Sequence, residues 1–213
     1  MQRVKVWKPL DGDVEGVRKT FEQRMQKRYE GWSDTFDSQW DKNSFLFALE
    51  EKDTYLATCR LIIKRYHDIT FKTAMEVADT QSYSLENYKN ICVEGGMLSY
   101  SDLASFGKLM YHVSSWTIEN DVDHLFTCYD LENPLIKRLY LKTLGFDIVE
   151  GANLVFGGFT SKKTSKDVHW QVVKTDRKQG KLIVENLRAY SENKYESGRY
   201  PSLKEWIENN AMY

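Results

Sequence analysis

The residues best placed for chemistry lie between Asn90 and Gly151, where candidate strands, loops and helices alternate. The apolar run Ile91–Val93 predicts a strand, and the small, polar segment Gly95–Asp102 that follows Glu94 predicts a loop. A carboxylate at the end of a strand beside a loop can act as a general base. It can equally cap the loop or pair with Arg60, and the sequence leaves these roles open.

A helix is predicted directly after this loop. Its apolar positions recur at helical spacing: Leu103, Phe106, Met110, Val113 and Thr117. Asp102 stands before the first of them, at a position where aspartate commonly caps a helix. The free backbone N–H groups of a first helical turn suit a phosphate or another anion, helped by the helix dipole. The segment is therefore a candidate anion site close to Glu94.

The alternation continues to Gly151. Asp123–Tyr129 is a second candidate for a buried strand, and Asn133-Pro134 opens a helix with proline in its first turn. Gly145 ends this helix. Its apolar face is made of Leu135, Leu139 and Leu144, and a further strand starts with Phe146, Ile148 and Val149.

The chain before this region predicts a strand, a helix and a hairpin. The strand is indicated by Val4, Val6 and Leu10, and the helix by Val14, Val17, Phe21 and Met25 at helical spacing. Tyr29–Asp41 is rich in aromatic and acidic residues, but its apolar residues follow neither the helical period nor the alternation of a strand. This predicts a loop or a short irregular helix. Ser44–Glu50 and Tyr55–Lys64 predict an antiparallel hairpin, and Thr73–Ala78 a short helix. Arg60 inside the second strand must face solvent or pair with a carboxylate.

The chain after Gly151 predicts a closing hairpin and a helical extension. The strands of the hairpin are Asn153–Phe159 and Asp167–Lys174. After Arg177–Gly180, the segments Lys181–Tyr190 and Ser202–Ala211 are expected to be helical or mixed, divided by a breaker at Ser197–Pro201. Pro201-Ser202 opens a last amphipathic helix. We expect one domain over residues 1–213, with residues 181–213 as a C-terminal extension.

Composition limits the classes of function. The 213 residues are 41% hydrophobic, which suffices for a substantial core, and 30 basic against 31 acidic residues give a net charge of −1. We therefore expect neither a nucleic-acid nor a membrane partner. With no apolar signal core and no membrane-spanning run, we expect a cytoplasmic protein. Metal-ligand spacing is found neither among the cysteines, Cys59, Cys92 and Cys128, nor among the histidines, His67, His112, His124 and His169. No metal site is therefore expected.

One part of the chain resembles a known superfamily. The series Asn133-Pro134, Leu139-Tyr140 and Leu144-Gly145-Phe146 resembles the closing motif of GCN5-related N-acetyltransferases (GNAT). The resemblance implies an α+β, GNAT-like acyl-CoA N-acyltransferase fold, with a central mixed, mostly antiparallel sheet flanked by helices and followed by the C-terminal helical extension.

Residues further upstream resemble one branch of that superfamily. In chain order they are Arg18, Phe21, Trp32, Asp37 or Asp41, Arg60 and Glu94. The set is similar to that of acyl-homoserine-lactone synthases and N-acyl amino acid synthases. The resemblance implies an autoinducer-synthase-like N-acyltransferase that moves an acyl group from acyl carrier protein or acyl-CoA to a small-molecule amine. That branch has an arginine two positions after its glutamate, where this chain has Gly96.

The resemblance also implies roles for individual residues. Glu94 would be the general base for the amine, and Tyr140 the acid that protonates the leaving thiolate. The donor thioester would bind at Met97, Leu98, Ser99, Tyr100, Ser105, Phe106, Gly107 and Asn133. Among the substrate-binding residues, Arg18 and Arg60 would contact an acceptor carboxylate, and Trp32 would help to roof an acyl pocket.

Structural roles remain open for most of these residues. Tyr140 can be a packed aromatic side chain, and Asn133 can be an N-cap beside Pro134. The two arginines can hold Asp37 and Asp41 in ion pairs. The spacing of Trp32, Phe36 and Trp40 also fits core packing.

Two other functions and the oligomeric state also stay open. A small-molecule N-acetyltransferase would use acetyl-CoA and show no preference for long chains. A catalytically inactive binding module is suggested by the predicted phosphate loop, which keeps only Gly107 and places Asp102 where a phosphate would sit. The chain can be a monomer or a homodimer.

Overall fold

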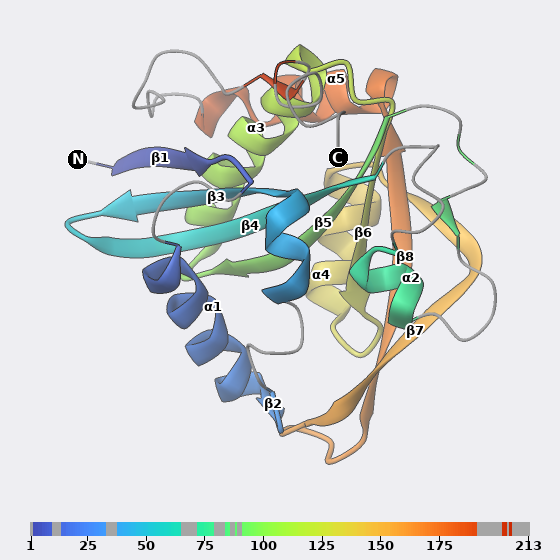
Figure 1. Cartoon of the computed structure of the whole chain (residues 1–213). Helices are drawn as coiled ribbons and strands as arrows, with labels where there is room; N and C mark the ends of the chain where they lie inside the picture. Colours follow the sequence, from blue (N-terminus) through green and yellow to red (C-terminus); the bar gives the residue numbers. More distant parts are fainter. Residues whose placement is uncertain are drawn as a thin grey trace.

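The computed structural model describes residues 2–9, 14–32, 38–64, 72–78, 84–85, 88, 91–190, 202–203 and 205. An eight-stranded sheet runs through them in the order β1-β3-β4-β5-β6-β8-β7-β2 (Figure 1). The strands are β1 (Gln2–Trp7), β2 (Tyr29–Glu30), β3 (Ser44–Glu51), β4 (Thr54–Lys64), β5 (Cys92–Tyr100), β6 (His124–Asp130), β7 (Asp147–Ser161) and β8 (Asp167–Asp176). All neighbouring strands pair antiparallel except β5 and β6, which are parallel.

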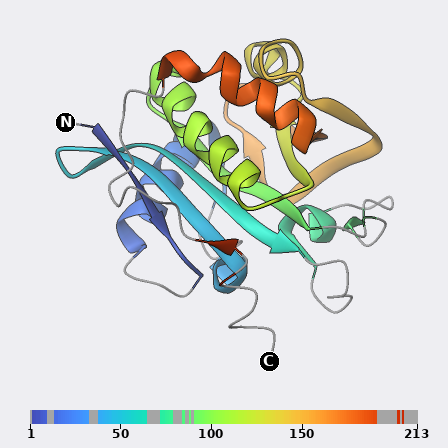
Figure 2. The ribbon, with the colours of Figure 1, turned by 90° about the horizontal axis from the view of Figure 1, so that it is seen from above.

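Helices cover both faces of the sheet. They are α1 (Glu15–Arg28), the 3-10 helix η2 (Ser38–Asn43), α2 (Ala74–Ala78), α3 (Leu103–Glu119), α4 (Pro134–Arg138), the π-helix η4 (Leu139–Thr143), α5 (Arg177–Asn186) and the 3-10 helix η5 (Arg188–Tyr190). Helices α3 and α5 lie side by side on one face (Figure 2), and α1 and α2 lie on the other. The predicted mixed, mostly antiparallel α+β architecture is confirmed.

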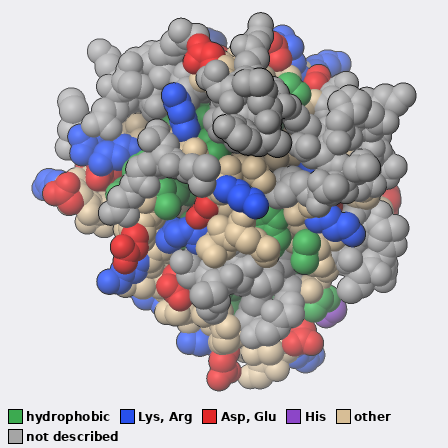
Figure 3. Space-filling view, viewed as in Figure 1, with side chains coloured by type: hydrophobic (Ala, Val, Ile, Leu, Met, Phe, Trp, Pro, Cys, Tyr) green, Lys and Arg blue, Asp and Glu red, His purple; other side chains and the backbone are tan. Residues whose placement is uncertain are grey.

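The alternation of side chains in β3 shows why both faces are covered. Phe45 and Phe47 pack against Trp116 of α3. Leu46 and Ala48, on the opposite face, share a core with residues of α1. A strand buried on both faces reads as a continuous apolar run, because neither side meets solvent. On the outer surface seen in Figure 3, lysine and arginine side chains are interspersed with carboxylates among the described residues.

The prediction that a strand ends at Val93 is wrong. Strand β5 continues to Tyr100, because the segment after Glu94 keeps β4 as an antiparallel partner as far as Ala57 opposite Tyr100. Pairing across the sheet thus overrides the local preference of a glycine-rich segment. The register shifts between Thr58 and Arg60, and Met97 has a φ of 49°, so the strand bends at a β-bulge.

The pairing of β5 with β6 is much shorter. It covers Cys92, Val93 and Glu94 and ends at the pair Glu94–Phe126. Beyond that point β5 stays with β4 while β6 stays with β8. The two central strands therefore separate immediately after Glu94.

Other predicted boundaries are corrected. The helical segment expected from Lys181 begins earlier, at Arg177, because Asp176 caps α5 and accepts a hydrogen bond from the Gln179 N–H at 2.8 Å. Strand β7 joins the two strands predicted on either side of Gly151 into one. Leu135, predicted on an apolar face, is 60% exposed.

The C-terminal extension is described only in part. Leu203 is fully buried in the core that also contains α3, and its N–H donates to Asn120 Oδ1 at 2.6 Å. Most of the predicted last helix lies outside the described residues, as do Leu10, Phe36, Asp37 and His67.

Candidate functional site

A cavity of about 950 Å³, including its mouth, opens where β5 and β6 separate. We call it the slot, and its two long walls are Gly95–Leu98 of β5 and Thr127–Asp130 of β6. Its lining combines Phe106 and Tyr140 from the core on the α3 side with residues of α1 and α2 from the other face. Both faces of the sheet therefore contribute to one cavity, which gives two reactants room to meet.

Glu94 lies at the inner end of the slot and is 1% exposed. Its Oε1 accepts a hydrogen bond from the Met75 N–H of α2 at 2.9 Å, while its buried Oε2 has no hydrogen-bond partner among the described residues. Burial, and secondarily the charge of Glu76, raise the pKa of Glu94 to about 7 against the opposing effect of hydrogen bonds and Arg60. A carboxyl group of this kind can exchange a proton near neutral pH.

Tyr140 lies on the opposite side of the slot, within the π-helix η4. It is 2% exposed and stacks on Tyr129 with ring centroids 6.2 Å apart. Burial raises the pKa of Tyr140 far above its usual value, with only partial compensation by the Thr127 hydroxyl. The phenol therefore keeps its proton at neutral pH. Single π-turns within α-helices are frequent at functional sites.

The predicted donor-binding residues of β5 divide into two groups. Met97, Leu98 and Tyr100 line the slot. Ser99 is buried behind that wall, where its hydroxyl shares a hydrogen bond of 2.8 Å with Thr58 and accepts one of 3.0 Å from Arg24. Ser99 thus holds the strand in place.

The first turn of α3 is occupied by its own cap. Asp102 Oδ1 accepts the Ser105 N–H at 2.8 Å, and Oδ2 accepts the hydroxyl groups of Ser101 and Ser105 at 2.7 and 2.9 Å. These hydrogen bonds, that from Ser101 first, lower the pKa of Asp102 and keep it ionised. Phe106 lines the slot, whereas Ser105 serves the cap and Gly107 is buried within α3. A phosphate at this turn would meet a carboxylate.

Asn133 both caps a helix and lines the slot. Its side chain accepts a hydrogen bond from the Ile136 N–H of α4 at 3.3 Å, which is the N-cap role expected beside Pro134. Asn133 also lines the slot together with Ile136, so capping does not remove it from the cavity.

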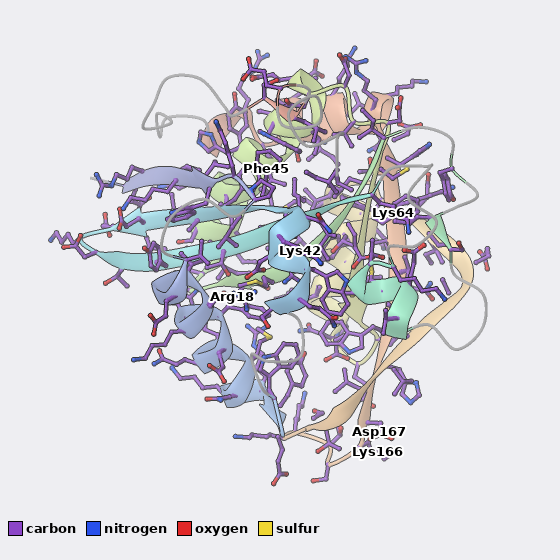
Figure 4. All side chains as sticks on the ribbon, viewed as in Figure 1. Arg18, Lys42, Phe45, Lys64, Lys166 and Asp167 are labelled. Carbon is purple, nitrogen blue, oxygen red and sulfur yellow. The ribbon has the colours of Figure 1, made fainter. Side chains whose placement is uncertain are left out.

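The two predicted arginines share one carboxylate. Asp41 of η2 pairs with Arg18, and its Oδ1 lies 3.2 Å from Arg60 Nη1. Arg18 is buried on α1, on the side that faces the rest of the molecule (Figure 4), and lies outside the slot lining. Arg60 lines the slot, and its Nη2 lies 3.4 Å from where a Cβ on Gly96 would stand. Its guanidinium thus occupies the space that a side chain at Gly96 would enter.

The aromatic residues of the Tyr29–Asp41 segment separate in space. Trp32 lines the slot and packs edge-on against Phe21, with ring centroids 5.6 Å apart. Trp40 lies in a different core with Ile62, and its indole N–H donates to the Lys72 carbonyl at 2.8 Å. Only the first of these two tryptophans can touch a ligand in the slot.

Sequence reasoning missed several lining residues: Met25, Arg28, Tyr29, Met75, Asp130 and Trp170. Arg28 could have been found, because it continues the helical spacing that joins Phe21 and Met25 on one face of α1. Its guanidinium lies 5.9 Å from the ring centroid of Tyr100. Trp170 comes from β8, and no local sequence pattern indicates that it lines the slot.

Metal-binding clusters and membrane-spanning helices are both absent from the described residues. The described part of the chain contains no cluster of three or more His, Cys, Asp or Glu side chains that could hold a metal ion. Among the same residues, no helix is long and apolar enough to cross a membrane.

Comparison with solved structures identifies the fold. An N-acetyltransferase from Staphylococcus aureus Mu50 aligns with a TM-score of 0.55 at 14% identity, covering 83% of this chain and 98% of that one. FeeM, an N-acyl amino acid synthase from uncultured soil microbes, aligns with a TM-score of 0.56 at 13% identity, covering 89% and 98%. The chain has the GNAT fold.

A third structure with this fold belongs to the synthase group. The CoA-dependent acyl-homoserine lactone synthase BjaI, solved with SAM and isopentyl-CoA, aligns with a TM-score of 0.54 at 10% identity, covering 88% of this chain and 90% of that one. No protein-family model and no curated protein matches the sequence. At these identities the likeness establishes the GNAT fold, as the closing motif around Tyr140 predicted, and leaves the activity to be argued from the slot.

Proposed function

We propose that this GNAT-fold protein is an N-acyltransferase that moves an acyl group from a thioester donor to the amine of a small-molecule acceptor. One observation carries the proposal: the Glu94 carboxyl is buried at the inner end of the slot, and its Oε2 meets no hydrogen-bond partner within the described part of the chain. A buried polar atom without a partner is costly, and functional sites are where such a cost is retained.

The proposed reaction is a single displacement. The amine nitrogen attacks the thioester carbonyl carbon, and Glu94 accepts the proton that the nitrogen loses, directly or through a water molecule. The C–S bond then breaks, the electron pair stays on sulfur, and Tyr140 donates a proton to the thiolate. Backbone N–H groups at the Met97 bulge are the proposed donors to the carbonyl oxygen. Glu94 and Tyr140 line one cavity, so one bound thioester can reach both.

Apolar walls support a donor with a hydrocarbon chain. Phe21, Met25 and Trp32 line the α1 side of the slot, and Met75 lines it from α2. We therefore propose a synthase-like substrate pair, in which an acyl chain longer than acetyl packs against these residues. The structures named as N-acyl amino acid synthase and acyl-homoserine lactone synthase share the fold, which is consistent with this choice.

The capped α3 turn bears on the form of the donor. Because Asp102 occupies the place where the pyrophosphate of CoA would be expected, the pantetheine thioester rather than the nucleotide should supply most of the binding. Acyl carrier protein and acyl-CoA are both compatible with this arrangement. A catalytically inactive binding module is the second candidate, and the same Asp102 cap is the observation that favours it.

The test combines activity with matched variants. The purified chain is incubated with acyl-CoA or acyl-loaded carrier protein and a panel of amines, and thiol release and amide product are measured. We expect amide formation that is lost in Glu94→Gln and retained in Glu185→Gln, the same change at an exposed position on α5. Thioester binding without any amide formation would favour the binding module, and absence of both would refute the proposal.

A further inference from the structure

Two charged residues with no role in the proposed reaction are buried beside Glu94. Lys64 ends β4 and is 1% exposed, and Glu76 belongs to α2 and is 7% exposed. Lys64 Nζ lies 3.2 Å from Glu76 Oε2, and Figure 4 labels Lys64 on the α2 side of the molecule. A buried ion pair is weak support for stability, because desolvation offsets much of its attraction.

Glu76 holds the turn at the start of α2. Its Oε2 accepts the backbone N–H of Thr73 at 2.9 Å and the Thr73 hydroxyl at 3.1 Å, while the Glu76 N–H lies 3.4 Å from Thr73 Oγ1. This reciprocal arrangement is a capping box. Its Oε1 accepts the Leu85 N–H at 2.7 Å, so one carboxylate fixes two segments of the chain.

The same turn orients Glu94. Met75 lies inside the capping box, between Thr73 and Glu76, and its N–H donates to Glu94 Oε1 at 2.9 Å. Because this bond fixes one carboxyl oxygen, the other is left at the wall of the slot. Any loosening of the box would move the donor on which that orientation depends.

The charges of neighbouring residues also affect the ionisation of Glu94. Glu76 disfavours ionisation of Glu94, and Arg60 of β4 favours it. Cys128 of β6 also faces Glu94, but burial and the Glu94 charge raise the pKa of that thiol, so it stays neutral. Lys64 Nζ lies 3.2 Å from Glu76 Oε2, so its positive charge partly offsets the effect of the Glu76 charge on Glu94.

We propose that Glu76 and Lys64 form a positioning pair for Glu94. Glu76 fixes the turn whose Met75 N–H orients the carboxyl group, and Lys64 holds Glu76 in place through their ion pair and partly offsets its charge. The inference rests on the function proposed above for Glu94. Neither residue lines the slot, so neither is assigned contact with substrate.

The first test uses three variants and the pH profile of kcat/KM. Glu76→Gln should lower the midpoint of the rising limb by about half a pH unit, and Lys64→Met should raise it by about as much. The double variant, which removes both charges, should return the midpoint close to that of the wild type. If all three variants lose activity equally at every pH with an unmoved midpoint, the pair is merely structural and the proposal is overturned.

A second measurement needs neither activity nor a variant. In ¹⁵N-labelled wild-type protein, the Met75 amide shift should titrate with a midpoint near pH 7, because its partner is Glu94. The Leu85 amide, which is bonded to Glu76 and not to Glu94, serves as the reference. A Met75 amide that does not titrate between about pH 5 and 9 overturns the positioning role. A chain that shows this titration but transfers no acyl group would refute the proposed function alone.

Discussion

Replacing Glu94 by glutamine should stabilise the protein at alkaline pH while removing its activity. The side chain of Glu94 is 1% exposed, and its Oε1 accepts a hydrogen bond from the Met75 N–H. Glutamine has nearly the same shape and can keep that bond through its own Oε1. It carries no charge, so it avoids the desolvation that an ionised carboxylate meets at this position.

The size of the effect follows from the pKa. Burial raises the pKa of Glu94 from 4.5 to about 7, so the folded state binds the proton more tightly than the unfolded chain. The stability contributed by the protonated group is therefore complete below about pH 4.5 and is lost as pH rises through about 7. Each pKa unit corresponds to about 1.36 kcal/mol, so the free energy of unfolding of the wild type falls by about 3 kcal/mol over this pH range. Glu94→Gln carries no such proton and keeps that stability.

Urea denaturation at several pH values measures this difference. The free energy of unfolding of Glu94→Gln minus that of the wild type should grow by about 3 kcal/mol between about pH 4.5 and 8.5. Glu185→Gln, at an exposed site on α5, should show no such growth. A difference between Glu94→Gln and the wild type that stays constant over this range would refute a buried, high-pKa carboxyl at the slot.

Three further predictions concern the slot and its surroundings. Tyr140→Phe should lower kcat by about 100-fold and leave the pH midpoint unchanged, as measured by thiol release, because only the proton donor is lost; an unaltered kcat would remove Tyr140 from the mechanism. Acyl-pantetheine should support a kcat/KM within about threefold of that of acyl-CoA, because Asp102 occupies the α3 turn; a loss of about 100-fold or more would show that the nucleotide is bound. Asp102→Ala should reduce the free energy of unfolding by about 1 kcal/mol in urea, whereas Asp102→Asn, which keeps a capping oxygen, should change it by less than half of that; equal losses would contradict the cap.

Local chemistry was sufficient to predict the elements whose signals lie within a few residues. The cap at Asp102, the helix start at Asn133-Pro134 and the hairpin of β3 and β4 all formed where expected. In each case a side chain bonds a backbone group three residues away, or two strands pair across a short turn. Such features depend little on the rest of the fold.

Features that depend on distant partners were not predicted. The continuation of β5 beyond Glu94 requires β4 as a neighbour, and the place of Trp170 in the slot requires β8 to lie between β6 and β7. The π-turn that carries Tyr140 has no sequence signature of its own. One signal was readable but unused: Thr73 and Glu76 have the spacing of a capping box.

The pH dependence of acyl transfer tests the role of Glu94 most directly. The initial rate of thiol release from an acyl thioester, with a panel of amines present, is followed from about pH 5 to 9 for the wild type and Glu94→Gln. The wild-type kcat/KM should rise with a midpoint near pH 7, and the variant should show no rising limb and little activity. A variant that transfers acyl groups at the wild-type rate across this range would show that Glu94 is not the base.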